Sequence, residues 1–360
     1  MEKEREEQVI SLCQKLIQQK SYSGEESGVV GVLSENMKQM GFDEVTVDKY
    51  GNIIGCIKGN RPGKKGLFDG HIDTVPVTEE TEWLYPPFAA EIHDGKIYGR
   101  GTSDMKGAVA AMTCAASNYA KDTGKDFAGE IYVAGVVHEE CFEGVAAREI
   151  SKNVRPDYVV IGEASQLNLK IGQRGRTEIV IETFGKPCHS ANPEKGINAV
   201  YKMAKVIGAI RTLVPTHHPV LGDGILELTD IKSAPYPGAS VVPEYCRATY
   251  DRRLLVGETK ESVLEPINGL LEKLMAEDPE LKVKASYAVG RERCHTGNEI
   301  EGERFFPGWL YDKDDDFVQA VYTKLTDKGF TPEITQYNFC TNGSHYAGEE
   351  KIKTFGLGPS

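Results

Sequence analysis

Apolar residues recur at helical spacing near the start of the chain and then give way to short apolar runs. Val9, Cys13 and Leu16 fall on one face of a helix, and a second helix is predicted over 25–40, with Gly41 as its stop signal. The later runs predict strands at 45–48, 53–58, 65–68, 130–137 and 158–161, and helices at 106–120 and 144–150. Strands that alternate with helices indicate an α/β sheet with helices on both faces.

The middle of the chain follows a different order. Its patterns predict a strand, a helix, two strands, a helix and a strand, at 176–184, 197–211, 224–232, 247–254, 260–275 and 282–288. This order is typical of a ferredoxin-like α+β sandwich. The α/β pattern then returns, with a helix at 314–328 and strand residues at 351–355. We therefore predict a domain built from residues 1–175 and 291–360, with a smaller domain, residues 176–290, inserted into it.

Charge and composition narrow the class of protein. The 360 residues include 42 Lys and Arg against 54 Asp and Glu, and this net charge of −12 argues against nucleic-acid and anionic-membrane partners. The most apolar stretch, 108–116, is far shorter than the roughly 20 residues that span a bilayer. The charged N-terminal residues lack the apolar segment of a signal peptide, so we expect a cytoplasmic location. A small-molecule enzyme fits these properties best.

Acidic and histidine residues gather at the ends of the predicted strands. In GHIDTVP, residues 70–76, His71 and Asp73 follow a strand and would lie at the edge of the sheet where α/β proteins place their ligands. Residues i and i+2 of an extended chain face the same side, so Asp73 could accept the spare N–H of a metal-bound His71. A polar turn with a surface histidine is the alternative reading.

Three further clusters share this position. Asp104 precedes a helix in GRGTSDMKG, which also fits a simple N-cap, whereas the spacing fits no phosphate-binding loop. Glu139 and Glu140 end an apolar strand, where two carboxylates repel each other unless a metal ion or a proton compensates them. Glu163 ends another strand in GEAS. One imidazole with several carboxylates suits Zn²⁺, Mn²⁺ or Co²⁺, and two such ions would activate a water molecule and polarise a carbonyl group.

These motifs, together with the later GKPCHSANPEKG, resemble those of the co-catalytic metallohydrolases. That family includes acetylornithine deacetylase, succinyl-diaminopimelate desuccinylase, aminoacylase and glutamate-releasing carboxypeptidases. The resemblance runs from about residue 8 to residue 360. It implies a zinc-peptidase-like catalytic domain, with helices on both faces of a mixed sheet, and an inserted ferredoxin-like lid and dimerisation domain. It also implies one or two zinc ions, with cobalt or manganese as substitutes.

The resemblance implies roles for the residues at the strand ends. His71 and Glu163 would hold one metal ion, Asp104 would bridge to the second, and Glu140 would bind that second ion. A cis peptide bond often follows the bridging aspartate in this family, so we expect one between Asp104 and Met105.

Three further residues would take part in catalysis without binding metal. Asp73 would be the partner of His71. Glu139 would be the general base, taking a proton from the attacking water and passing it to the leaving nitrogen. His189, in the insert, would reach the active site of the partner in a homodimer joined through residues 176–290 and stabilise the oxyanion there.

The resemblance also suggests substrate contacts. Arg253 matches the arginine that pairs with the substrate carboxylate, and Arg252 is an equally basic neighbour. Ser240 stands where the family commonly has asparagine, so the usual contact at the carboxylate end is changed. Asn342 lies in a loop, CTNGSH, that matches the family's glycine-rich substrate loop loosely.

We therefore predict a hydrolase that cleaves an amide-type C–N bond in N-acyl amino acids, short peptides or N-carbamoyl compounds. The family ends with a Gly-x-Gly-Pro-like turn and then a histidine that completes the second metal site, whereas this sequence ends at Ser360 within the turn. The competing expectation is therefore an impaired or non-catalytic form that binds at most one metal ion tightly. A phosphate-binding α/β protein is a third possibility, although no suitable loop supports it.

Overall fold

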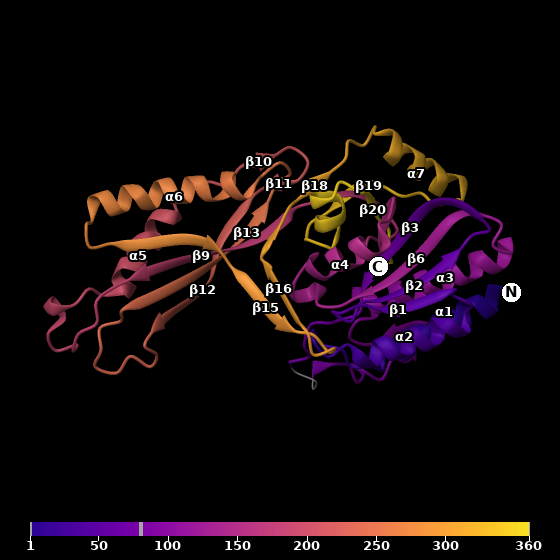
Figure 1. Cartoon of the computed structure of the whole chain (residues 1–360), viewed down its shortest axis with the longest axis horizontal. Coiled ribbons are helices and arrows are strands. Elements are labelled where there is room, and N and C mark those ends of the chain that lie inside the picture. Colours follow the sequence, from indigo (N-terminus) through magenta and orange to yellow (C-terminus); the bar gives the residue numbers. More distant parts are fainter. Residues whose placement is uncertain (1, 79–81, 360) are drawn as a thin grey trace. The chain divides into compact units, whose positions relative to one another are not determined.

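The computed structural model describes residues 2–78 and 82–359, and the chain divides into two compact units. Unit 1 comprises Met1–Gln173, Gly290–Gly302 and Trp309–Ser360, and unit 2 comprises Arg174–Val289 and Glu303–Gly308. Figure 1 shows their elements and labels most of them. The division differs from the predicted one at 303–308, because a two-residue strand there, β17 (Phe305–Phe306), pairs with the first long strand of unit 2. A strand this short carries no periodicity from which it could be predicted.

Unit 1 is a mixed sheet covered by helices. Its described helices are α1 (Glu2–Ile17), α2 (Ser27–Gln39), α3 (Gly107–Thr123), α4 (Val145–Val154) and α7 (Asp316–Asp327). The strands of its main sheet are β1 (Glu44–Val47), β2 (Ile53–Lys58), β3 (Arg61–His71), β6 (Ala128–Val136), β7 (Tyr158–Ile161), β8 (Leu169–Gln173), β18 (Trp309–Leu310), β19 (Ile334–Tyr337) and β20 (Lys353–Gly356). Two hairpins, β4 (Glu91–His93) with β5 (Lys96–Tyr98) and β15 (Val289–Arg293) with β16 (Glu299–Glu303), and three short turns, η2 (Thr102–Lys106), η3 (Glu139–Cys141) and η5 (Ser344–Glu349), complete the described elements.

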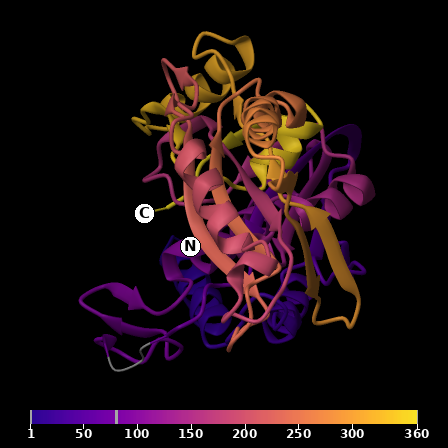
Figure 2. The ribbon, with the colours of Figure 1, turned by 90° about the vertical axis from the view of Figure 1, so that its left-hand side faces the viewer.

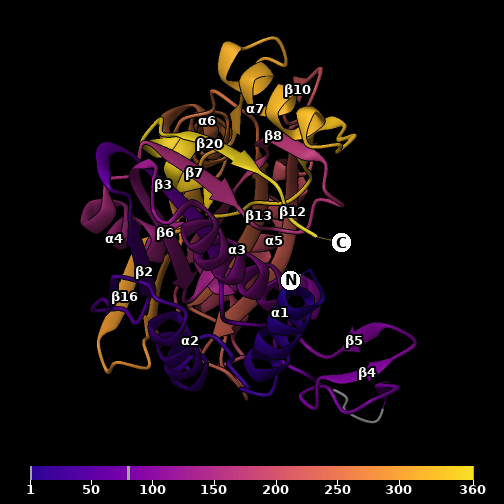
Figure 3. The same ribbon diagram turned by 90° about the vertical axis from the view of Figure 1, so that its right-hand side faces the viewer.

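The order of the strands explains how the helices are distributed. The sheet runs β1-β2-β6-β3-β7-β20-β8-β18, with β19 beside β8, and its centre, β6-β3-β7-β20, is parallel. The chain crosses from β3 through α3 to β6, and then back through α4 to β7. Because such crossovers are right-handed, two that run in opposite directions place α3 and α4 on opposite faces of the sheet. On the α3 side, α1 lies against α3, as Figure 3 shows.

Unit 2 has the predicted order of elements. They are β9 (Gly175–Phe184), η4 (Pro193–Lys195), α5 (Ala199–Ile210), β10 (His217–His218), β11 (Gly222–Asp223), β12 (Ile225–Ala234), β13 (Tyr245–Leu254), α6 (Lys260–Glu277) and β14 (Lys282–Tyr287). The antiparallel sheet has the order β12-β13-β9-β14, which is that of a ferredoxin-like sandwich. Apolar side chains from α5 and α6, such as Met203 and Leu271, pack against Ile181 of this sheet, and Figure 2 shows α5 lying over its strands.

Among the described residues, none of the helices combines the length and the apolar character that crossing a membrane requires.

Candidate metal centre

The candidate residues of unit 1 meet at one edge of the sheet. His71 is the last residue of β3, Glu139 and Glu140 follow the end of β6, and Glu163 follows the end of β7. Since β3 lies between β6 and β7 and runs parallel to both, the three carboxyl ends point to the same edge. Asp104 reaches this edge from the η2 turn that precedes α3.

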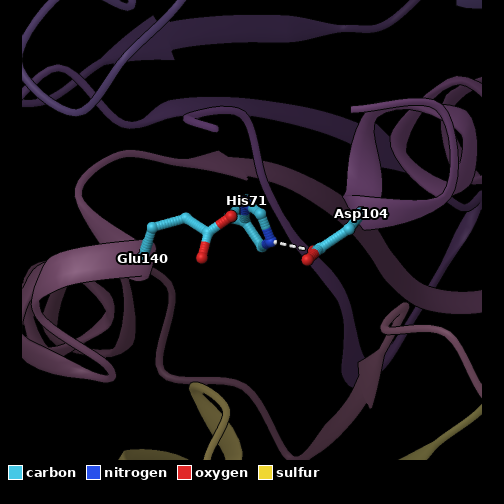
Figure 4. Close-up of side chains that lie close together, drawn as sticks. All are labelled: His71, Asp104 and Glu140. Atoms are coloured by element: carbon cyan, nitrogen blue, oxygen red, sulfur yellow. Dashed lines mark hydrogen bonds and ion pairs between the residues drawn. The ribbon is translucent and has the colours of Figure 1, made fainter. Parts of the chain in front are cut away.

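His71 is the centre of the cluster. Its Nε2 atom lies 2.8 Å from Oδ1 of Asp104 and 3.5 Å from Oε1 of Glu163. In Figure 4, Glu140 and Asp104 lie on either side of this imidazole. Ligand atoms of two sets of residues lie within 4.8 Å of one another: His71 with Asp104 and Glu140, and His71 with Glu139 and Glu163. The structure therefore brings together all of the residues proposed from the sequence as metal ligands, and Glu139 with them.

The orientation of His71 is set by Asp73, but not as the sequence suggested. The Nδ1 atom donates to the backbone carbonyl oxygen of Asp73 at 2.9 Å, whereas the nearer carboxylate oxygen is 3.6 Å away. The predicted carboxylate contact is thus replaced by a backbone contact, because that carboxylate accepts from Ser23 and from the backbone of Glu139 and Glu140. A proton held on Nδ1 leaves Nε2 as the ligating atom of the imidazole.

The cluster has several carboxyl groups but only one imidazole, and its burial shifts their pKa values. Desolvation raises the pKa of Glu140 to about 7 and that of Glu163 to about 8, and it raises the pKa of Glu139 well above its usual range. Burial opposes protonation of His71, but the charge of Glu163 and the hydrogen bond to Asp104 outweigh it, so its pKa lies well above the ordinary value. Several buried carboxylates around one imidazole are costly unless a cation joins them.

The donor set fits a divalent metal ion. It offers one imidazole and several carboxylates, which are ligands that zinc accepts in catalytic sites. Oε1 of Glu139 is buried and, among the described residues, has no hydrogen-bond partner. The side chain of Asp104 is 62% exposed, so the cluster opens to solvent on that side. The peptide bond between Asp104 and Met105 is cis, as expected.

Unit 2 carries the candidate residues His189 and Ser240. His189 is exposed and pairs in a β-bridge with Val241, and the N–H of Ser190 donates to the carbonyl oxygen of Ser240 at 3.0 Å. His189 and Ser240 are therefore neighbours. The backbone N–H of Ala191 donates to Nδ1 of His189 at 3.1 Å, so the neutral ring carries its proton on Nε2.

The structure separates the two neighbouring arginines. Arg252 is 7% exposed and pairs with Glu258, which also accepts from the backbone N–H of Leu255. Arg253 is 31% exposed and pairs with Asp251 through Nε at 2.8 Å. The side chain of Arg252 is thus committed to a buried ion pair, and Arg253 is the one that a ligand can reach.

Asn342 has a different environment from the one predicted. It is buried, its Nδ2 donates to Asp69 at 3.0 Å, and its Oδ1 accepts from the backbone N–H of Gly144 at 2.8 Å. Because both ends of the amide are used inside unit 1, the predicted contact of this side chain with substrate is not supported. Asn342 instead joins its loop to β3 and to the start of α4.

Two residues near the cluster were not predicted from the sequence. Ser23 and Glu26 lie between α1 and α2 and contact Asp73 and the backbone of His138. Their motif, SYSGEE, looks like an ordinary helix N-terminus, and nothing in it points to partners so far along the chain.

The comparisons with known proteins identify a metal-dependent hydrolase that acts on C–N amide bonds, and the cluster of metal-ligating residues agrees with them. The chain belongs to the peptidase family M20/M25/M40, which matches residues 67–360. It is 34% identical to the uncharacterized protein YgeY of Escherichia coli (strain K12) over 346 residues, 94% of this chain and 83% of YgeY. It is 29% identical to succinyl-diaminopimelate desuccinylase 2 of Ruegeria sp. (strain TM1040), over 71% of this chain and 67% of that one.

Solved structures share the fold. The YXEP protein of Bacillus subtilis, described as a dinuclear metal-binding peptidase of the M20 family, superimposes with a TM-score of 0.71 at 14% identity. The match covers 99% of this chain and 89% of that one.

Proposed function

We propose that this protein hydrolyses the amide bond of N-acyl amino acids or short peptides and releases a product that carries a free carboxylate. The observation that carries the proposal is the buried carboxylate oxygen of Glu139, which lies beside His71 and Glu163 and has no hydrogen-bond partner among the described residues. Relatives named succinyl-diaminopimelate desuccinylase support an acylated amino acid as the substrate class.

The metal in this proposal is zinc, as one or two ions, with cobalt or manganese as substitutes. His71, Asp104, Glu140 and Glu163 would hold it. A bound divalent ion lowers the pKa of water and polarises a carbonyl oxygen. The dinuclear metal binding described for the YXEP protein supports the two-ion form.

Glu139 acts as the general base in this proposal. Burial raises its pKa well above its usual range, so it holds a proton more strongly than an exposed glutamate does. A carboxylate of this kind takes a proton from the attacking water and keeps it for the leaving nitrogen. Oε1 is free of hydrogen bonds to the described residues, so it can face the water.

Two residues of unit 2 complete the proposal. His189 carries its proton on Nε2 and would donate it as a hydrogen bond to the developing oxyanion, while Arg253 would pair with the substrate carboxylate. We propose that unit 2 is a lid and forms a homodimer, in which each His189 serves the partner's site. Sedimentation velocity tests this part: a dimer at micromolar concentration supports it, and a strict monomer contradicts it.

An activity screen tests the reaction. Purified protein is incubated with N-acetyl and N-succinyl amino acids and with dipeptides, in the presence of Zn²⁺, Co²⁺ or Mn²⁺, and release of the free amine is measured. We expect hydrolysis of at least one substrate with a free carboxylate, and little hydrolysis of its carboxamide analogue. Equal rates for acid and amide would contradict the role of Arg253, and no hydrolysis in any condition would contradict the proposed reaction.

A further inference from the structure

The loop between α1 and α2 is joined to the end of β3. Oγ of Ser21 donates to the carbonyl oxygen of Ile72 at 2.7 Å, and the N–H of Thr74 donates to the carbonyl oxygen of Ser21 at 2.9 Å. Tyr22 and Thr74 form a parallel β-bridge. The loop therefore adds one isolated β-bridge to the chain that follows β3, just after His71.

Ser23, also in this loop, contacts the carboxylate of Asp73. Oγ of Ser23 donates to Oδ2 at 2.6 Å, a short hydrogen bond to a charged acceptor. The same carboxylate accepts from the backbone N–H of Glu139 at 3.1 Å and from that of Glu140 at 3.2 Å. Asp73 is completely buried, so these donors replace the water that a carboxylate would otherwise bind. Asp73 thus links the loop to the turn that carries both glutamates.

Glu26 provides a second link from the same loop to the same turn. Its Oε1 accepts from the backbone N–H of His138 at 3.3 Å and from that of Gly24 at 2.8 Å, and the side chain is completely buried. Gly24 has φ +90°, and a Cβ atom there would lie 2.8 Å from the carbonyl oxygen of Arg293. Only glycine allows the loop to turn in this way and present Ser23 and Glu26 to the two strand ends.

We propose that Ser23 is a positioning residue of the hydrolase. By holding the Asp73 carboxylate, it fixes the backbone of Glu139 and Glu140, and so it sets the general base and a metal ligand together. This inference rests on the proposed function, because it assigns Ser23 a task in that same site. Removing the hydroxyl leaves Oδ2 with the N–H of Glu140 as its donor among the described residues, so the Asp73 carboxylate and the turn that bears Glu140 are held less firmly.

The experiment compares three variants of the full chain with the natural sequence. Ser23→Ala removes the donor, Ser23→Thr keeps it, and Ser27→Ala changes an exposed serine a few residues further along. For each variant we measure kcat and KM, the Kd for Co²⁺ added alone, and the visible absorption spectrum of the bound Co²⁺. Outer partners of metal ligands change metal affinity by roughly 10–100-fold, so we expect Ser23→Ala to weaken Co²⁺ binding and lower kcat by about 10-fold or more, with KM nearly unchanged.

The variants distinguish a positioning role of Ser23 from a merely structural one. Ser23→Thr should restore kcat and the Co²⁺ spectrum, and Ser27→Ala should change neither. The proposal is overturned if Ser23→Ala keeps the natural kcat, Co²⁺ affinity and spectrum, even if its thermal stability falls, because that outcome describes a merely structural serine. Ser23→Cys, a weak donor of similar size, replaces the alanine variant if that variant does not fold, and it should show a smaller loss. If the natural protein hydrolyses no amide, the proposed function fails, while Co²⁺ affinity and spectrum still test Ser23.

Discussion

Lys106 is completely buried, and its Nζ atom donates to the carbonyl oxygen of Leu16 at 3.1 Å. A second bond, of 2.8 Å, goes to the carbonyl oxygen of Gln19 just beyond α1. Burial lowers the pKa of this lysine to about 8. The lysine therefore caps the end of α1 and holds the loop in which Asp104 lies.

Lys106→Met keeps the length of the side chain but removes both bonds. The carbonyl oxygen of Leu16 still accepts from the backbone N–H of Gln19 at 3.2 Å, whereas the carbonyl oxygen of Gln19 loses the donor that Lys106 supplies. An unsatisfied buried group costs about 1–3 kcal/mol, so we expect the free energy of unfolding to fall by about 1–3 kcal/mol. Denaturant titration measures the change, with Lys121→Met, at an exposed position of α3, as the control. Equal unfolding midpoints for the two variants would show that the bonds contribute nothing.

Glu139→Gln should separate metal binding from turnover. The amide keeps the shape of the side chain but cannot carry the proton, and general acid–base catalysis contributes typically 10²–10⁴-fold. We expect kcat to fall within about that range while the metal content of the purified protein stays the same. Asp104→Asn is the matched comparison, since it should lose metal as well as activity. An unchanged kcat for Glu139→Gln would contradict the assignment of Glu139 as the general base.

Glu26 makes stability depend on pH. Burial, reinforced by the charge of Asp73, raises its pKa from 4.5 to about 7, so the folded state binds a proton that the unfolded state has lost. The free energy of unfolding therefore falls as the pH rises from 4.5 to about 7, by about 3 kcal/mol for this group. Glu26→Gln should abolish that component, whereas Glu25→Gln, at an exposed neighbour, should not. Parallel stability curves for the natural protein and Glu26→Gln across this interval would contradict the prediction.

Arg253 and Arg252 should respond differently to substitution. Arg253→Ala is expected to raise KM for substrates with a free carboxylate by about 10-fold or more, since a charged hydrogen-bonded pair contributes about 1.5–3 kcal/mol. Its effect on thermal stability should be small. Arg252→Ala removes the cation that pairs with the half-buried Glu258 and should destabilise the protein instead. If Arg253→Ala leaves KM unchanged and Arg252→Ala raises it, Arg253 is not the residue that pairs with the substrate carboxylate.

One principle predicts much of the candidate metal centre. Parallel strands end together, so acids that follow apolar strands, such as Glu139 and Glu163, could be placed beside His71 from the sequence alone. The roles of Asp73 and Asn342 could not, because they depend on which backbone groups come within reach after folding. Asp73 bonds residues 66 and 67 positions away along the chain, and Asn342 bonds one 273 positions away.

The missed strands have an equally physical explanation. β8, with the sequence LKIGQ, has two inward apolar residues, Leu169 and Ile171, which pack against Val318 of α7. Two apolar residues are too few to define a period of two. The β15–β16 hairpin is rich in charge and glycine, so no apolar pattern marks it. Apolar runs therefore predicted even the four-residue strand β7, whereas strands without such a run, although one residue longer, were not predicted.

The most direct test of this account is metal dependence measured on one sample. Protein is stripped with a chelator, its metal content is determined, and Zn²⁺ is then added back stepwise while hydrolysis of the best substrate and bound metal are both followed. We predict that hydrolysis is lost with the metal, returns in proportion to bound Zn²⁺, and does not return in His71→Ala. Undiminished hydrolysis by the stripped protein, or full recovery in His71→Ala, would contradict the claim that this cluster is a catalytic metal centre.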